Sequence, residues 1–176
     1  ILQHYKSQIK QTLSNDEIFH FFEDNKLILL FLFQNDIITI SEAICEEMLI
    51  KFETNGNRFC HFFYPEIEKV LSEEKSKEIK DELLTRYPDL FDNYEEKRQV
   101  GENDSYLCSL IRKDSVVEFI SYMNFHNISY SSQIAPSIFE TNSFLIENKN
   151  TTLIEYSAFF GSIQIFQHLL LSKVEL

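Results

Sequence analysis

Four side chains, Cys60, His61, Cys108 and His126, are of the types that bind zinc or form a nucleophilic Cys–His pair. Their spacing contains no close C-x-x-C pair, which would place zinc or redox ligands side by side. The favoured interpretation is buried thiols and ordinary histidines. We therefore expect no catalytic residue, no metal and no cofactor.

The remaining polar residues also predict no reaction centre. His4, His20 and His168 lie on or beside apolar stretches, where packing is the expected role. The sequence contains no glycine-rich phosphate loop and no G-x-S-x-G motif. Adjacent carboxylates point to different sides of a helix and cannot easily share a metal or a proton, so we interpret them as solvated; these pairs are Glu46-Glu47, Glu73-Glu74 and Glu95-Glu96.

The charge and the apolar runs exclude two classes of partner. A formal net charge of -12 repels nucleic acid and anionic membrane surfaces. The longest apolar run, Leu27 to Phe33, is far shorter than the ~20 residues of a membrane span, so we expect no membrane insertion. Three widely spaced cysteines favour a reducing compartment, and the predicted location is cytoplasmic.

The elements that would position any site are expected to be helices, because 3 Gly and 3 Pro are too few for the turns of a β-sandwich or barrel. Ser14–Glu17 has the spacing of a capping box before a helix over about 15–23, and Thr39–Glu42 has the same spacing before a helix that ends near 54–57. Pro65 suits a helix start. The charged stretch 66–98, divided by Pro88, predicts surface helices with one narrow buried edge, formed by Ile79, Leu83, Leu84, Leu90 and Phe91.

The C-terminal part predicts helical hairpins. Apolar faces on either side of Arg112-Lys113-Asp114 indicate one hairpin over 105–124, and a second is expected over 152–171. Between them, 127–149 is rich in Ser, Asn and Thr, and Pro136 is expected to start a single helical turn over 137–139.

The segment Thr152 to Leu170 resembles an ankyrin repeat, with the pattern T-P-L-H-x-A-A-x-x-G-H-x-x-x-V-x-x-L-L. The matching residues are Thr152, Ile154, Ala158, Gly161, Phe166, Leu169 and Leu170. Gly161 can adopt the positive φ of the turn, and the last three residues are expected to face the core. Leu153, Glu155 and Ser162 replace the Pro and the two His of the pattern.

Two weaker copies follow the same template. One places Asp114 on the Gly position and uses Leu107, Leu110, Ile111, Phe119 and Met123. A looser one places Asn25 on the Gly position and uses Ile18, Phe21, Phe22, Leu30 and Phe33.

Four phrases extend the resemblance over nearly the whole chain: His61-Phe-Phe-Tyr-Pro-Glu, Gly101-Glu-Asn-Asp-Ser-Tyr, Pro136-Ser-Ile-Phe-Glu-Thr-Asn-Ser-Phe and Glu155-Tyr-Ser-Ala-Phe-Phe-Gly-Ser-Ile-Gln. The chain is similar to the uncharacterised ankyrin proteins expanded in trichomonad-type protists, in which the array continues. The resemblance implies an all-α helical-hairpin solenoid, with a helical N-terminal cap over 1–100 and degenerate ankyrin-like repeats over 101–176. A start at Ile1 and a stop at Leu176 favour a fragment truncated at its C-terminal end.

The expected function is protein–protein interaction as a scaffold or adaptor, with no catalytic activity and a protein partner. The expected contact residues are Tyr106, Ser109, Arg112, Tyr156, Phe159 and Phe160. Phe159 and Phe160 form either an exposed hot spot or a packing surface for 127–149. Two alternatives stay open: a helical regulatory portion of an enzyme whose catalytic part lies outside this chain, and a structural cap with no partner of its own.

Overall fold

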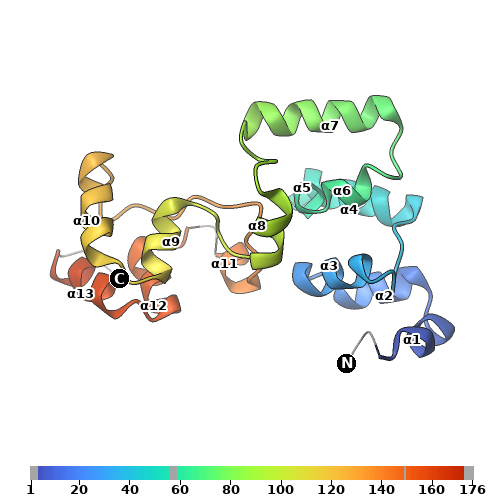
Figure 1. The fold of residues 1–176 in the computed structure, drawn as a ribbon, viewed down its shortest axis with the longest axis horizontal. Coiled ribbons are helices and arrows are strands. Elements are labelled where there is room, and N and C mark those ends of the chain that lie inside the picture. Colours follow the sequence, from blue (N-terminus) through green and yellow to red (C-terminus); the bar gives the residue numbers. More distant parts are fainter. Residues whose placement is uncertain (1–3, 56–58, 149, 173–176) are drawn as a thin grey trace. The chain divides into compact units, whose positions relative to one another are not determined.

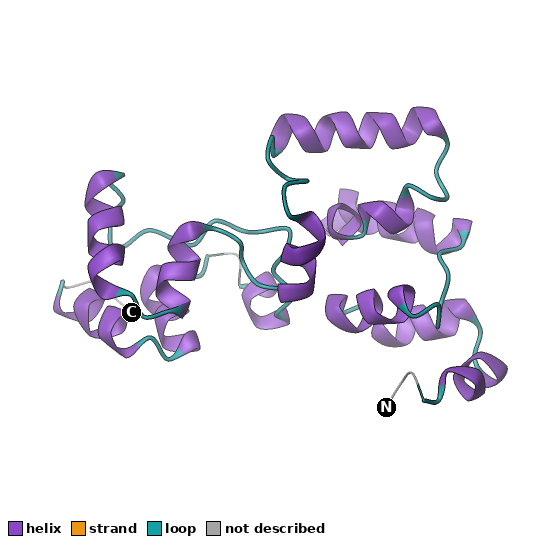
Figure 2. Cartoon of the chain, in the orientation of Figure 1, coloured by secondary structure: helices purple, strands orange, loops and turns teal. Residues whose placement is uncertain are grey.

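The chain is helical throughout the part that the structure describes. The structure is a computed structural model that describes residues 4–55, 59–148 and 150–172. Within these ranges the helices are joined by loops and turns, and strand pairing is limited to an isolated antiparallel bridge between Gln133 and Thr152 (Figure 2). The predicted all-α class is confirmed. Over the same ranges, each helix is too short or too polar to traverse a lipid bilayer.

Two compact units divide the chain, Ile1–Val100 and Gly101–Leu176. Figure 1 shows their helices in chain order. The first unit contains α1 (Lys6–Thr12), α2 (Asn15–Phe22), α3 (Lys26–Gln34), α4 (Glu42–Asn55), α5 (Phe59–Phe62), α6 (Tyr64–Ile67), α7 (Glu73–Arg86) and α8 (Tyr94–Val100). The second contains α9 (Tyr106–Arg112), α10 (Val116–Phe125), α11 (Ser143–Glu147), α12 (Leu153–Phe160) and α13 (Ile163–Leu171).

Local side-chain capping explains where α2 and α3 begin. The Ser14 hydroxyl accepts from the Glu17 amide while the Glu17 carboxylate accepts from the Ser14 amide, so the predicted capping box is confirmed. Asn25 caps α3 by accepting from the amide of Ile28, with φ −121°. Asn25 is therefore an N-cap and not the left-handed turn residue that the looser repeat copy required, and that part of the prediction is wrong.

The capping residue of α4 also differs from the prediction. The helix begins at Glu42, so the residue before it, Ser41, accepts from the Ile44 amide at 3.2 Å. The Thr39 hydroxyl instead accepts from the Asn15 side-chain amide at 2.9 Å. The predicted box at Thr39 is wrong because α4 begins three residues later, at Glu42. The helix ends at Asn55, and the turn expected at Gly56 and Asn57 lies outside the described residues.

The charged stretch 66–98 forms helices divided near Pro88, as predicted, but it also contributes to the core. Arg98 is fully buried, and its guanidinium pairs with Glu66 at 2.7 Å and with Glu95 at 2.9 Å. The same group lies over the rings of Phe62 and Tyr94, at 5.3 and 5.5 Å from their centroids. Leu83 and Leu90 are buried, as expected for the edge of this stretch, but the burial of the charged Arg98 was not predicted.

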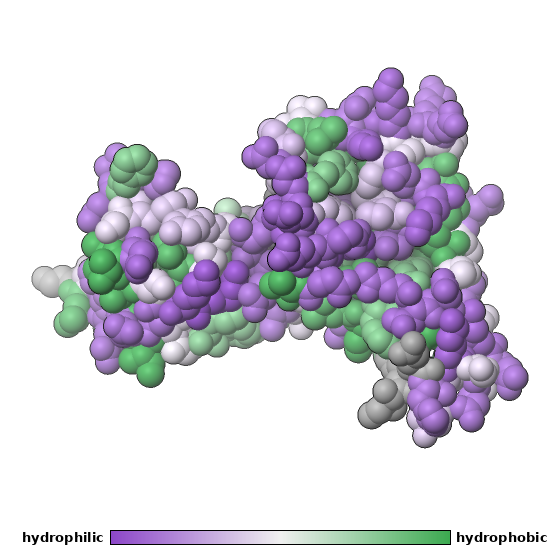
Figure 3. All heavy atoms as spheres, in the orientation of Figure 1, coloured by the Kyte–Doolittle hydropathy of each residue, from purple (hydrophilic) through white to green (hydrophobic). Residues whose placement is uncertain are grey.

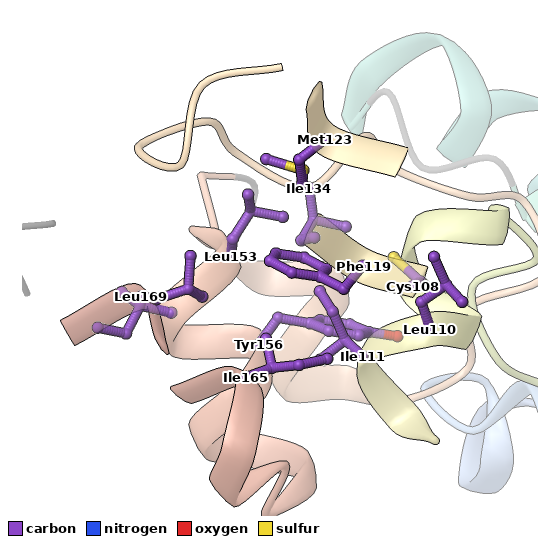
Figure 4. Packing of buried hydrophobic residues seen from close by; sticks show 11 residues of the cluster. Cys108, Leu110, Ile111, Phe119, Met123, Ile134, Leu153, Tyr156, Ile165 and Leu169 are labelled. Carbon is purple, nitrogen blue, oxygen red and sulfur yellow. The ribbon is translucent and has the colours of Figure 1, made fainter. Parts of the chain in front are cut away.

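The second unit is built around two helical hairpins, α9–α10 and α12–α13, at the two places predicted. Helix α9 packs on α12 and α10 packs on α13. Figure 4 shows apolar side chains from all four helices meeting in one core, with Phe119 and Tyr156 near its centre. Leu169 faces this core as predicted, whereas Leu170 is 48% exposed, because Ile165 occupies the inward face of α13.

The turns of the two hairpins have the same backbone hydrogen bonds. Asp114 has φ 52° and Gly161 has φ 68°, both left-handed. The residue after each, Ser115 or Ser162, donates its amide to the carbonyl five residues earlier, at 3.0 and 2.9 Å. This is the Schellman pattern. The positive φ predicted for Gly161 is confirmed, and Asp114 shares it.

The segment 127–149 does not form the predicted turn of helix over 137–139. The Ser137 hydroxyl accepts from the Phe139 amide and donates to Asp104, which holds a bend instead. The buried Glu140 carboxylate accepts amides of Asn103, Thr141 and Asn142. Helix α11 follows, with Asn142 as its N-cap.

Candidate protein-binding surface

An aromatic pair stands at the surface of the second unit. Phe159, in the last turn of α12, stacks on Phe144 of α11 with the ring planes 3° apart and the centroids 5.5 Å apart. Phe144 is 54% exposed and Phe159 is 41% exposed. Phe160 lies edge-on to Phe159 at 5.0 Å and is half-buried. We call Phe144, Phe159 and Phe160 the aromatic patch.

Phe159 packs against the 127–149 segment, as one alternative expected, and is also partly exposed. Its ring packs against the 127–149 segment through Phe144, yet the stacked pair keeps about half of each ring in solvent. In a space-filling view, hydrophobic residues lie at the surface of this unit between hydrophilic ones (Figure 3). Stacking holds the rings in place without burying them, so they are pre-ordered for contact.

Arg112 lies next to the patch in a fixed position. Its guanidinium donates to the Tyr156 hydroxyl at 2.7 Å and pairs with Glu102 at 2.7 Å. It also lies 5.8 Å from the centroid of the Phe160 ring. Glu102, Tyr156 and Phe160 already hold the guanidinium, so the Arg112 side chain loses little conformational entropy when a partner binds.

Tyr156 does not fit the contact role expected from the sequence. It is 1% exposed, and its ring lies in the core beside Ile111 and Leu110 (Figure 4). Burial raises the pKa of its hydroxyl, so the phenol stays neutral and accepts the hydrogen bond from Arg112. Tyr156 therefore positions Arg112 and has no surface to offer a partner.

Tyr106 and Ser109 contact residues of α9 and α10, which are not part of the aromatic patch. Tyr106 is 57% exposed and packs on Tyr122 of α10 at 5.2 Å, and Tyr122 in turn packs on His126 at 4.3 Å. The Ser109 hydroxyl donates to the Tyr106 carbonyl at 2.8 Å. The six expected residues therefore do not form one surface: Tyr106 and Ser109 make their contacts within α9 and with α10, Tyr156 is buried, and Arg112 adjoins Phe160, which belongs with Phe159 to the aromatic patch.

The side chains considered for chemistry are placed as follows. Cys60 and Cys108 are buried free thiols, and burial raises the pKa of Cys60 to about 12 and raises that of Cys108 as well. Both stay protonated near neutral pH, and a thiol is a far weaker nucleophile than a thiolate. His126 is exposed and contacts the rings of Tyr122 and Phe125.

The other histidines differ from one another. His168 packs at the edge of Tyr130 at 5.1 Å, as predicted for a packing residue. His20 was expected to pack as well, and its ring lies edge-on to Phe19 at 5.7 Å, but its side chain is 56% exposed and faces the carboxylate of Glu23 at 3.1 Å. Its ring points to solvent and carboxylates because apolar Ile18 and Phe19 take the buried face of α2.

Sequence reasoning missed Phe144 and Glu102. The sequence signal for Phe144 was Asn142 before the apolar run Phe144-Leu145-Ile146, which is an N-cap followed by a short helix. Glu102 had no signal, because its partner Arg112 is paired only through the folded turn at residues 101–105.

Comparison with known proteins gives a partial match to a curated protein. No protein-family model matches the chain, and no solved structure matches it. Over 135 residues it is 30% identical to adenylate cyclase type 10 of Rattus norvegicus. The matched region is 70% of this chain but spans only 7% of the length of that protein.

Proposed function

We propose that the chain is a protein-interaction module without catalytic activity, and that its second unit presents the aromatic patch to a protein partner. Within this proposal, the two hairpins are degenerate ankyrin-like repeats of a solenoid, and residues 1–100 are their helical cap. Support comes from the shared turn hydrogen bonds at Asp114 and Gly161 and from the packing of α9 on α12 and α10 on α13. Side-by-side hairpins with a common turn are the repeating unit of such arrays.

The observation that carries the proposal is the stacked pair Phe144 and Phe159, with half-exposed rings contributed by two separate segments. Large rigid aromatic side chains beside an ordered arginine are typical of the residues that dominate binding energy at protein interfaces. The family resemblance to ankyrin proteins of trichomonad-type protists and a cytoplasmic location belong to the same proposal. Three buried free cysteines are compatible with a reducing compartment.

The proposed partner presents an apolar side chain to the patch and carries net positive charge. The first property follows from the exposed rings. The second follows from the charge of -12, which attracts a basic partner at long range and accelerates association at low ionic strength. Raising the salt concentration should therefore slow association more than it changes dissociation.

The test is the variant Phe159→Ser, with Phe125→Ser as the matched control. Phe125 is 82% exposed on α10 and is not part of the patch. Partners cross-linked to the wild-type chain in cells are identified by mass spectrometry and then measured with purified proteins. Phe159→Ser should weaken binding at least about tenfold, the size of a hot-spot loss, and Phe125→Ser should leave binding nearly unchanged.

Thermal unfolding of the same variants separates binding from folding. Because Phe159 is 41% exposed, its truncation should cost roughly 1 kcal/mol, less than the ~3–5 kcal/mol typical of a fully buried Phe. A loss in the buried range would show that the ring is mainly a core residue and would reject the binding-surface proposal. Equal loss of binding in both serine variants would also reject it.

A second candidate function is a helical regulatory portion of an enzyme whose catalytic part lies outside this chain. The 30% identity to a short stretch of adenylate cyclase type 10 favours it. To test it, the full reading frame of the gene is expressed. The complete protein and its Phe159→Ser variant are then assayed for adenylate cyclase activity. Activity that changes in the variant supports this candidate, and absence of activity in the complete protein rejects it.

A further inference from the structure

A histidine and two glutamates converge in the first unit. His20 lies in the last turn of α2, Glu23 is the residue that ends this helix, and Glu47 comes from α4. His20 Nδ1 is 3.1 Å from Glu23 Oε2 and 3.7 Å from Glu47 Oε1. All three potential ligand atoms lie within 4.8 Å of one another, the one such group within the described residues.

The two distances from His20 Nδ1 are close to the edge of a zinc coordination shell. Zinc binds histidine nitrogen and carboxylate oxygen at about 2.0–2.2 Å, and in a tetrahedron this separates neighbouring ligand atoms by about 3.3–3.5 Å. The two distances from His20 Nδ1, 3.1 and 3.7 Å, lie on either side of that value. A divalent cation could therefore be accommodated with small side-chain movements.

Accessibility and charge agree with the geometry. The side chains of His20, Glu23 and Glu47 are 56%, 27% and 33% exposed, so an ion can enter from solvent and keep a water ligand. Nδ1 faces both carboxylates, so one nitrogen and two oxygen ligand atoms converge as a divalent cation requires. Binding would use the lone pair of Nδ1 and release any proton held there.

The nitrogen ligand decides the class of cation. Calcium and magnesium prefer shells of oxygen ligands, whereas imidazole with carboxylates suits zinc and its neighbours among the transition metals. We propose that His20, Glu23 and Glu47 bind a divalent transition-metal cation of the zinc type, linking the end of α2 to α4. This proposal rests on the first unit alone and does not depend on the function proposed for the second.

The experiment is isothermal titration of zinc chloride into the whole chain after treatment with a chelator. The wild-type chain should bind one zinc ion, and His20→Ala and Glu47→Gln should each weaken the affinity at least about tenfold, the lower bound seen even for lost outer-shell partners. Glu46→Gln is the matched control. It removes the same charge from the neighbouring exposed residue of α4, which is outside the cluster, and should change the affinity less than about twofold.

Two further measurements identify the ligands. Cobalt chloride should produce the visible absorption of a low-symmetry cobalt site in the wild-type chain and in His126→Ala, which removes another exposed histidine, but not in His20→Ala. Circular dichroism checks that each variant is folded. The proposal is overturned if the wild-type chain binds no zinc, if Glu46→Gln weakens binding as much as Glu47→Gln, or if excess calcium displaces zinc from the site.

Discussion

The two hairpins of the second unit share a backbone but use different residues at the turn. Gly161 adopts the left-handed conformation without a side chain, whereas Asp114 adopts it with one. The Asp114 carboxylate accepts the amides of Gln164 and Ile165 at 3.0 Å each, so it caps the first turn of α13 in the other hairpin. The left-handed aspartate therefore couples neighbouring hairpins, and the glycine only closes its own.

A second difference supports the same view. Ser162 precedes α13 but does not cap it, because its hydroxyl donates to the Ile111 carbonyl of the first hairpin. The start of α13 thus depends on Asp114, and the end of α9 depends on Ser162. Two reciprocal side-chain contacts fix the register between the hairpins, in addition to the apolar core.

The largest effect is expected for Asp114→Ala. The substitution removes the charged cap of α13 and leaves a β-carbon at positive φ on a residue less tolerant of it than aspartate, which together should cost about 2–3 kcal/mol of unfolding free energy. Asp114→Gly removes the carboxylate but relieves the backbone strain, so its loss should be about 1 kcal/mol smaller. Urea unfolding of both variants gives the difference. Equal losses would mean that the backbone conformation contributes nothing.

Gly161→Ala should have a smaller effect, about 1–2 kcal/mol. A β-carbon built at Gly161 meets nothing within 4 Å, so the cost is the left-handed backbone alone. Gly161→Asn should lose less than Gly161→Ala because asparagine tolerates this conformation. The same unfolding measurement applies. A loss larger than that of Asp114→Ala would contradict the conclusion that Asp114 has the additional coupling role.

The positions of both hairpins could be predicted from the sequence because they depend on local signals. Apolar spacing and the turn residue Gly161 act within a few residues, and the structure follows them; the Ser14 cap of α2 in the first unit is local in the same way. The coupling by Asp114 could not be predicted, because its acceptor role depends on amides 50 and 51 residues away along the chain. The buried state of Arg98 was missed for the same reason, since Glu66 is 32 residues away.

The candidate surface was predictable only in part. Phe159 and Phe160 follow from the repeat template, whereas Phe144 comes from a segment whose composition is typical of a loop. Tyr156 was predicted on the correct helix, but it was expected to be exposed and is buried. In a helix of eight residues between two packed neighbours, the apolar pattern leaves more than one face compatible with burial.

The smallest expected effect concerns the N-terminal ends of the same hairpins. Thr152 and Glu155 form a capping box at the start of α12. Ser105 caps α9 in the same way, but the residue three positions later is the buried Cys108, which has no carboxylate or amide to complete a box. Hydrogen bonds from the backbone amide and hydroxyl of Thr152 lower the pKa of Glu155 below its ordinary 4.5.

Because the pKa of Glu155 is lower in the folded state, the unfolded chain binds the proton more tightly. The stabilisation by the box is therefore complete above the ordinary pKa and is lost as pH falls through the folded value. Glu155→Gln keeps the box but cannot titrate, so the difference in unfolding free energy between wild type and this variant should shrink on acidification only in that range. Amide exchange should show fraying at α12 and not at α9. A difference that stays constant with pH would mean that the carboxylate does not hold the end of α12.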